Sequence, residues 1–197
     1  SVNGVAALHS EILRNSCFKY FYELWPEKFN NKTNGITQRR WLRLANWELS
    51  QLITETIGDK WVTNLFELKK LENFINDKNF REKFRQIKLN NKKRFADYIK
   101  ENNGIDVDVD SIFDCQVKRI HEYKRQLLNV LHVITYYNRI KDNPGKKFVP
   151  RTVIFSGKSA PGYHQAKLII KLINSVADVV NNDPEVNKYL KVVFIAN

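Results

Sequence analysis

The spacing of hydrophobic residues divides the chain into a helical first half and an alternating second half. Apolar positions recur every three or four residues, as along one face of a helix, over residues 5–23, 39–45, 47–57, 65–75 and about 80–104. Pro26 and Gly58 end two of these helices, and a polar loop over residues 30–35 separates the first from the second. The last helix is expected to place five side chains on one face: Phe80, Phe84, Ile87, Phe95 and Tyr98.

Beyond Gly104, short apolar runs alternate with amphipathic stretches. The pattern predicts strands at 112–117, 149–155 and 192–196, helices at 121–140 and 163–180, and a turn at 143–145. The first of these helices is expected to place Leu127, Leu131 and Ile134 on one face. The second is expected to place five side chains inward: Ala166, Ile169, Ile170, Ile173 and Val180. The fold class is therefore α/β: a partial Rossmann-like domain with a doubly wound parallel sheet, preceded by a largely helical segment. Three strands, the last at the end of the chain, are few, so we expect a truncated domain.

The composition excludes several classes of protein. With 43% hydrophobic and 12% aromatic residues, the 197-residue chain can bury a core and is not expected to be disordered. Neither a membrane span nor a signal peptide is expected, which predicts a cytoplasmic protein. Cys17 and Cys115 are in no CxxC pair and are expected to be free thiols. The histidines show no metal-ligand spacing, and no hydrolytic triad is predicted.

The formal net charge of +12 points to an anionic partner. A phosphate-bearing ligand is one class, and a basic module that binds nucleic acid is the alternative. The aromatic residues fall at helical core spacing and not in an exposed stacking series. We therefore expect no nucleic-acid partner. A steep salt dependence of RNA binding would favour the alternative.

The segment from Val117 to Gln126 is the most informative for chemistry. It joins an expected strand to an expected helix and contains four cations, Lys118, Arg119, Lys124 and Arg125, and one acid, Glu122. Cations near the positive end of a helix dipole are unfavourable unless an anion joins them, and helix N-termini with fixed cations hold phosphate. The other interpretation is a basic surface turn that is paired with acids elsewhere.

A second strand-to-helix connection runs from Ser156 to His164 and contains two glycines. Gly162 is followed by Tyr163 and not by Lys and Ser or Thr, so the loop is not a nucleotide P-loop. Its backbone could approach a ligand, or its glycines could serve only a tight turn.

Over essentially its whole length the chain resembles the α-glucan phosphorylases. The matching stretches are residues 2–6 with 9–11, 31–37 with 39–42, 116–128, 150–152, and 157–158 with 160–164. Gln38 stands where the family pattern has Pro, which touches no chemistry. The resemblance implies two Rossmann-like domains around a deep cleft, with pyridoxal 5'-phosphate at its base. The implied partners are inorganic phosphate and an α-1,4-glucan, whose terminal glucose leaves as glucose 1-phosphate, and the parent enzyme is expected to be a homodimer.

The resemblance also implies roles for the cations. Lys118 would contact the phosphate of the cofactor, and Arg119 and Lys124 would hold the substrate phosphate beside it, so that all three are catalytic candidates. Trp41 would pack near the cofactor. The Schiff-base lysine of the family lies in a Gly-Thr-Gly-Asn-Met-Lys motif that this sequence lacks, so we expect the isolated chain to be inactive.

For the sugar, the resemblance implies that Asn34 hydrogen-bonds the glucosyl unit and that Val5 lines its pocket. Tyr163 would stand near the mouth of the active-site channel. Residues 1–34 would be the C-terminal tail of the first domain, and residues 35–197 would be the first half of the second, cofactor-side domain.

Overall fold

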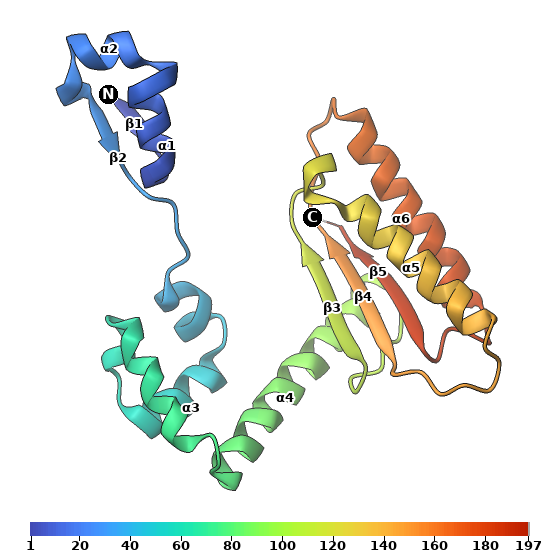
Figure 1. The fold of residues 1–197 in the computed structure, drawn as a ribbon. Helices are drawn as coiled ribbons and strands as arrows, with labels where there is room; N and C mark the ends of the chain where they lie inside the picture. The colour runs from blue at the N-terminus through green and yellow to red at the C-terminus, as the bar shows by residue number, and fades with distance from the viewer. Residues whose placement is uncertain (197) are drawn as a thin grey trace. The chain divides into compact units, whose positions relative to one another are not determined.

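The computed structural model describes residues 1–196. Asn197, the last residue of the expected second domain, lies outside the described residues. The contacts within the chain form two compact units, residues 1–87 and 88–197 (Figure 1). This division concerns compactness alone, and the expected domain boundary after residue 34 stays a prediction.

The first unit begins with a small parallel pair of strands, β1 (Val2–Gly4) and β2 (Phe29–Asn31). Between them lie α1 (Ala7–Ile12), a π-helical turn (Leu13–Cys17), α2 (Lys19–Leu24) and a 3-10 turn (Pro26–Lys28). The helix expected over residues 5–23 is thus interrupted at Phe18, whose φ of −127° leaves the helical region. Gly4 packs on Ser10 so closely that a Cβ there would lie 2.0 Å from Oγ.

The rest of the first unit is helical, as expected, but only partly α-helical. A π-helical segment (Arg39–Leu44) precedes α3 (Trp47–Ile57), which ends at Gly58 with a φ of 83°. Two 3-10 segments (Lys60–Val62 and Leu65–Phe74) lead to α4 (Lys78–Asn103). The side chain of Trp61 is fully buried, and its Nε1 donates to Thr54 Oγ1 at 3.1 Å.

The second unit contains a three-stranded parallel sheet in the order β3-β4-β5. The strands are β3 (Ile112–Val117), β4 (Arg151–Ser156) and β5 (Leu190–Ile195). The connections are α5 (Gln126–Lys141) and α6 (His164–Asn182). The α/β class and the parallel pairing that the sequence predicts are confirmed.

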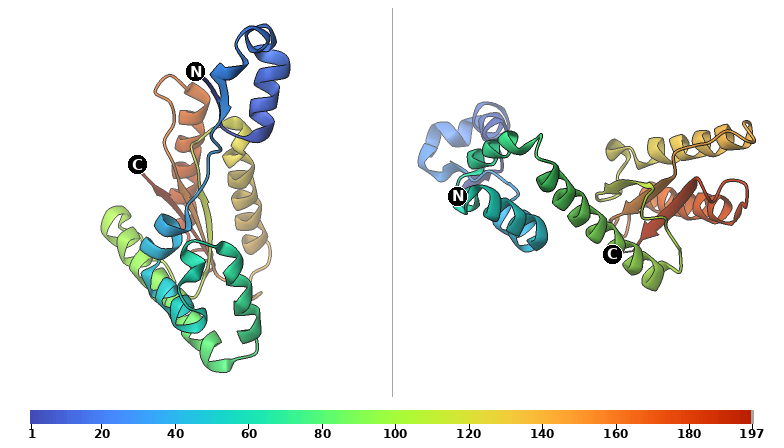
Figure 2. Two further views of the ribbon diagram at one scale, coloured as in Figure 1. Left: turned by 90° about the vertical axis from the view of Figure 1, so that its left-hand side faces the viewer. Right: turned by 90° about the horizontal axis from the view of Figure 1, so that it is seen from below.

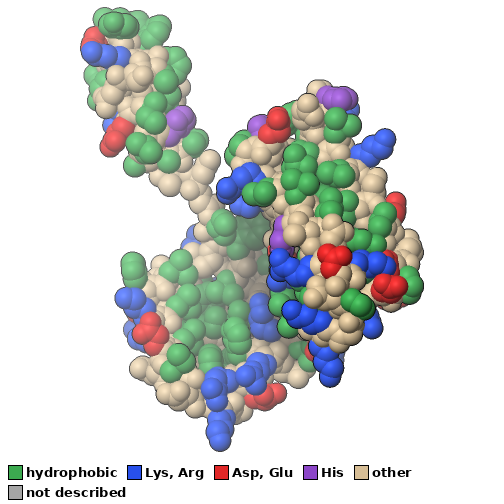
Figure 3. All heavy atoms as spheres, turned by 45° about the vertical axis from the view of Figure 1, so that its right-hand side comes forward, with side chains coloured by type: hydrophobic (Ala, Val, Ile, Leu, Met, Phe, Trp, Pro, Cys, Tyr) green, Lys and Arg blue, Asp and Glu red, His purple; other side chains and the backbone are tan. Residues whose placement is uncertain are grey.

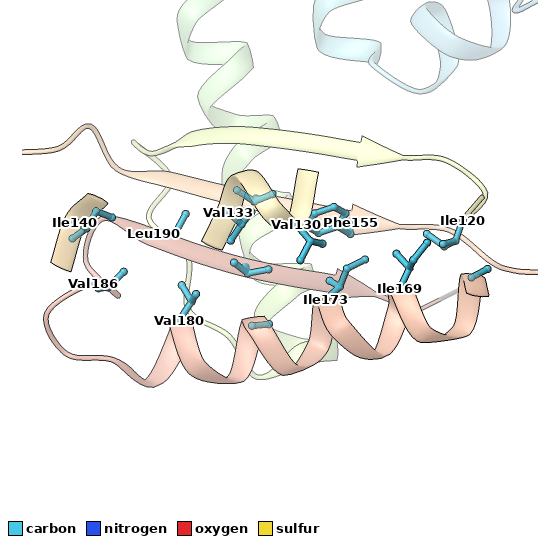
Figure 4. Packing of buried hydrophobic residues seen from close by; sticks show 14 residues of the cluster. Ile120, Val130, Val133, Ile140, Phe155, Ile169, Ile173, Val180, Val186 and Leu190 are labelled. Atoms are coloured by element: carbon cyan, nitrogen blue, oxygen red, sulfur yellow. The ribbon is translucent and has the colours of Figure 1, made fainter. Parts of the chain in front are cut away.

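Helices cover both faces of this sheet. Successive side chains of a strand point to opposite faces, so each face has apolar residues to bury. Val153, Phe155 and Val192 belong to the cluster under α5 and α6, whereas Ile154 and Val193 pack with Ile99 of α4 on the opposite face. Figure 2 shows α4 on one side and α5 with α6 on the other. Figure 4 shows the larger cluster, with Ile120 at the end where β3 and β4 point.

One expectation for α5 was wrong. The helix begins at Gln126 and not at His121, because residues 122–124 form a 3-10 turn and Arg125 is left-handed with a φ of 62°. Leu127 and Leu131 are 44% and 49% exposed, whereas Val130 and Val133 are buried. Two apolar stripes run side by side on this helix, and spacing alone does not say which one packs on the sheet. The inward face predicted for α6 is confirmed.

Candidate functional site

A cavity of about 630 Å³ opens at the carboxyl ends of β3 and β4. Two loops form it, residues 118–125 after β3 and residues 157–163 after β4, so the two segments that the sequence marks for chemistry meet. In an open parallel sheet, this end of the strands is where ligands bind. The lining residues are Arg119, Ile120, His121, Tyr123, Lys124, Lys158, Ser159, Ala160, Pro161 and Tyr163.

Three cationic side chains line the cavity: Arg119, Lys124 and Lys158. Among residues 88–196 as described, none of them makes an ion pair. The interpretation of the segment as a basic turn paired with acids elsewhere therefore finds no support within this unit. Unpaired like charges around one hollow repel one another, and an anion in the hollow would relieve that repulsion.

The one acid of the segment, Glu122, is held by a tyrosine and not by a cation. Tyr163 Oη donates to Glu122 Oε2 at 2.5 Å, and Glu122 N donates back to Tyr163 Oη at 3.3 Å. The hydrogen bond to this carboxylate raises the pKa of Tyr163. Tyr163 and Tyr123 also flank His121, with ring centroids 5.0 and 4.4 Å from its imidazole. All three of these rings line the cavity together with the cations.

The two loops are bonded to each other as a continuation of the β3–β4 pairing. Lys118 N donates to Ser156 O at 3.0 Å, and Ile120 N donates to Lys158 O at 3.1 Å. Gly157 passes so near that a Cβ on it would lie 2.0 Å from Lys118 O. The Ile120 side chain is buried in the core cluster and anchors the first loop there (Figure 4).

Side-chain amides below the cavity hold the first loop and were missed in the sequence. Gln126 is fully buried, and its Nε2 donates to Arg119 O at 3.0 Å. Gln116 Nε2 donates to Lys124 O at 3.0 Å, and Asn129 Nδ2 donates to Gln116 Oε1 at 3.0 Å. A signal existed for Gln126, since a polar residue four before Val130 in the buried stripe of α5 needs a partner.

The expected site residues fall in both units. Arg119, Lys124 and Tyr163 line one cavity, and Lys118 is exposed in the same loop without being among the lining residues. Lys158 lines the cavity and was not among the expected residues. The structure shows these positions, and the roles of the residues stay predictions.

In the first unit, the structure brings Val5 and Asn34 together, since Asn34 N donates to Val5 O at 2.9 Å. Both side chains are exposed, as is that of Trp41 at 62%. The proximity agrees with one sugar pocket for Val5 and Asn34, and their roles and that of Trp41 stay predictions.

The remaining candidates add little chemistry. Cys17 and Cys115 are free, and burial raises the pKa of the Cys115 thiol, with Asp114 adding to the effect. In residues 1–196, no helix is long and apolar enough to cross a membrane. No cluster of three or more His, Cys, Asp or Glu side chains in this part could hold a metal ion.

Comparison with known proteins gives a consistent picture. The family of carbohydrate phosphorylases matches residues 1–197. The chain is 57% identical over all 197 residues to the liver form of glycogen phosphorylase from Homo sapiens and 55% identical to the human muscle form. It is 57% identical over 195 residues, 99% of the chain, to glycogen phosphorylase from Synechocystis.

The chain spans 23% of the length of each of these relatives. The match nevertheless covers the whole chain, including both loops of the cavity. The chain therefore belongs to the carbohydrate phosphorylase family.

Proposed function

We propose that the protein of which this chain is a part is an α-1,4-glucan phosphorylase. It transfers the terminal glucose of glycogen, starch or maltodextrin to inorganic phosphate and releases glucose 1-phosphate. The observation that carries the proposal is the set of cations around the cavity at the carboxyl ends of β3 and β4. Within the described part of their unit, these cations make no ion pair. A phosphate acceptor needs such a hollow.

In this proposal Arg119 and Lys124 hold the attacking phosphate. The guanidinium group offers a planar fork for two phosphate oxygens, which orients the ion, and the ammonium group adds a point charge. Lys158 lines the same hollow and adds positive charge to it. Orientation matters because the phosphate oxygen must be in line with the glycosidic carbon.

In the same proposal the cavity holds a second phosphate group, that of pyridoxal 5'-phosphate. Three cations are more than one phosphate dianion requires for neutrality, so the donor set suits two phosphates side by side. When bound, the cofactor supplies a phosphate that exchanges a proton with the substrate phosphate. When the cofactor is bound, Lys118 would contact its phosphate group and Trp41 would pack beside it.

The sugar contacts and the setting complete the proposal. Asn34 hydrogen-bonds the glucosyl unit, Val5 lines its pocket, and Tyr163 stands at the mouth of the channel. The parent enzyme is a cytoplasmic homodimer with two Rossmann-like domains. The close approach of Asn34 and Val5 supports the first two assignments.

Substitution of Arg119 tests the proposal. We expect Arg119→Lys in the full-length protein to retain cofactor and lose much of its rate, because it keeps the charge and loses the fork. Arg119→Ala should lose roughly 3 kcal/mol or more of transition-state stabilisation. The measurements are the phosphate KM and kcat with glucan in excess, and the product is glucose 1-phosphate.

The control is Lys147→Ala, which removes an exposed cation between the α5–β4 turn and β4. A surface cation contributes about 0–1 kcal/mol, so this variant should behave as wild type. If Arg119→Ala has the same kinetics as Lys147→Ala, the cavity does not hold the substrate phosphate.

A further inference from the structure

The loop that carries Arg119 and Lys124 has two limbs. Residues 118–121, after β3, form the first limb, and residues 122–125, before α5, form the second. Both side chains are long, and each has about 2 kcal/mol of rotamer entropy when free. Where their charged ends meet a ligand therefore depends on where the backbone of each limb is fixed. The bonds to the β4 loop and the buried Ile120 side chain hold part of this loop. Further contacts to both limbs come from the amide side chains of Gln126, Gln116 and Asn129, which we call the amide frame.

Gln126 fixes the first limb from beneath. Its side chain has no exposed surface, and its amide group faces three consecutive peptide groups of the loop. Nε2 donates to Arg119 O at 3.0 Å and lies 3.5 Å from Lys118 O, while Oε1 accepts from His121 N at 3.3 Å. A buried amide with both donor and acceptor engaged resists displacement, because any shift leaves polar groups without partners.

Gln116 and Asn129 fix the second limb. Gln116 on β3 donates to Lys124 O, and Asn129 on α5 donates to Gln116 Oε1, each at 3.0 Å. Asn129 therefore orients the amide of Gln116, so that its NH₂ group faces the loop. Both supporting residues belong to regular elements, β3 and α5, which makes their positions rigid.

The conformation that the frame maintains is a strained one. Arg125, between the second limb and α5, has a φ of 62°, the left-handed region that costs a non-glycine residue about 1 kcal/mol or more. A loop with such a residue relaxes unless surrounding bonds determine its path. Arg119 and Lys124 would then move apart or turn away from the cavity.

We propose that Gln126, Gln116 and Asn129 are positioning residues for phosphate: they set the separation and direction of Arg119 and Lys124. The inference rests on the proposed function, since it concerns the same phosphate. It goes further because it makes the affinity for inorganic phosphate depend on neutral amides that do not touch the ion. Gln126 acts through the Arg119 limb, and Gln116 with Asn129 acts through the Lys124 limb.

The first test is Gln126→Met in the full-length protein, which keeps side-chain length and removes the hydrogen bonds. We expect the phosphate KM and the dissociation constant for inorganic phosphate, measured by isothermal titration calorimetry, to rise by about 10- to 100-fold. The KM for glucan should stay within about twofold of wild type. Calorimetry with inorganic phosphate alone needs no turnover, so it reports the site separately from the reaction.

The matched control is Asn181→Leu at the far end of α6. Asn181 also bridges backbone groups with its amide, since it bonds both N and O of Val192 at 2.9 and 2.8 Å. Its loss should lower thermal stability without altering phosphate affinity. If Gln126→Met lowers the melting temperature and leaves phosphate affinity as in Asn181→Leu, the frame is merely structural and the inference is wrong.

A double-mutant cycle separates this inference from the function on which it rests. If Gln126 acts through Arg119, Gln126→Met should change phosphate affinity much less in an Arg119→Ala background than in wild type. Equal effects in both backgrounds would overturn the inference and leave the proposed function intact. An Arg119→Ala protein with normal phosphate affinity would overturn the proposed function itself.

Gln116→Met is the second variant, because Gln126→Met could fail to fold. Gln116 is only half-buried, so its replacement disturbs the core less. We expect Gln116→Met to bind inorganic phosphate about tenfold more weakly than wild type. Most of this difference should disappear in a Lys124→Ala background. Wild-type phosphate affinity in a folded Gln116→Met protein would refute the role of the second limb.

Discussion

At the scale of single residues, Gly157 shows what its loop requires. An added Cβ would lie 2.0 Å from Lys118 O and 3.2 Å from Arg119 N, and the φ of 146° is one that side chains rarely adopt. We expect Gly157→Ala to cost roughly 1–3 kcal/mol of stability, because backbone must shift to admit the methyl group. That shift displaces the Lys118–Arg119 peptide, so phosphate affinity should fall as well.

Gly162→Ala is the control within the same loop, since nothing lies within 4 Å of its added Cβ. Thermal denaturation and phosphate titration of both variants check the expectation. Equal behaviour of the two would mean that the contact of Gly157 with the neighbouring loop is not needed. The structure gives Gly157 a reason that differs from both interpretations of this loop, the close approach of the two loops to each other.

The sequence predicts which residues have the right chemistry better than it predicts how they are held. Arg119 and Lys124 were identified because basic residues gather between a strand and a helix. Lys158 was missed because it is a single cation in a loop whose most conspicuous residues are its two glycines. Gln116 and Asn129 were missed because they bond across a turn whose path no periodicity describes. Gln116 donates to a backbone oxygen eight residues away, and Asn129 donates to the side chain of Gln116, thirteen residues away.

At the scale of elements, the ends of α5 and α6 are joined by a charged cluster. Asp183, which follows α6, accepts from Tyr137 Oη at 2.7 Å and lies 3.2 Å from Lys141 Nζ. Lys141 also pairs with Glu185 at 2.7 Å. The hydrogen bond from Tyr137 is the largest effect lowering the pKa of Asp183, and the hydrogen bonds to Glu185 and Asp183 raise the pKa of Lys141.

A lowered carboxylate pKa predicts a definite pH dependence. Asp183 stabilises the fold fully above the ordinary aspartate pKa of about 4, and this contribution is lost as the pH falls through its lowered folded pKa. We therefore expect Asp183→Asn to destabilise the protein at pH 7 and the difference from wild type to shrink below about pH 4. Urea unfolding at several pH values, followed by tryptophan fluorescence, measures this difference.

Glu185→Gln serves as the comparison, because its side chain is 70% exposed. Its effect at pH 7 should be small, as for other exposed pairs. A difference between wild type and Asp183→Asn that is constant from pH 7 to pH 3 would contradict the role of the ionised carboxylate.

The sequence predicts the order of elements well and their interior details less well. The strand at 112–117 and the helix at 47–57 have the predicted bounds, because apolar runs and Gly58 mark them sharply. The start of α5 was wrong because residues 121–125 have helix-compatible spacing but make a 3-10 turn that a left-handed Arg125 ends. Local strain of this kind depends on tertiary contacts, and no local pattern records it.

At the scale of the whole molecule, the first unit exposes much apolar surface. Leu8, Leu24, Trp47 and Phe66 are each more than half exposed, and Figure 3 shows many hydrophobic side chains at the surface of the chain. Contiguous exposed apolar groups mark surfaces that contact other protein. Relatives are about four times as long as this chain, since it covers 23% of them, so we expect further protein to cover this surface.

The 197 residues on their own are expected to be inactive. We expect the purified chain, supplied with glucan, phosphate and pyridoxal 5'-phosphate, to release no glucose 1-phosphate. It has the cations of the cavity but no Gly-Thr-Gly-Asn-Met-Lys motif and no methionine. A coupled assay of glucose 1-phosphate checks this, with the full-length protein as positive control. Turnover above background by the chain alone would show that the missing motif is not required.

The amide frame has a consequence for how the site responds to acid and base. Gln126, Gln116 and Asn129 neither gain nor lose protons at any pH at which proteins fold. A frame of carboxylates and amines would change its hydrogen bonds as it titrated, and the cations of the cavity would move with it. With neutral amides, the hydrogen bonds of the frame do not depend on the pH, so in the proposed function a proton exchanged between phosphates would leave these bonds unaltered.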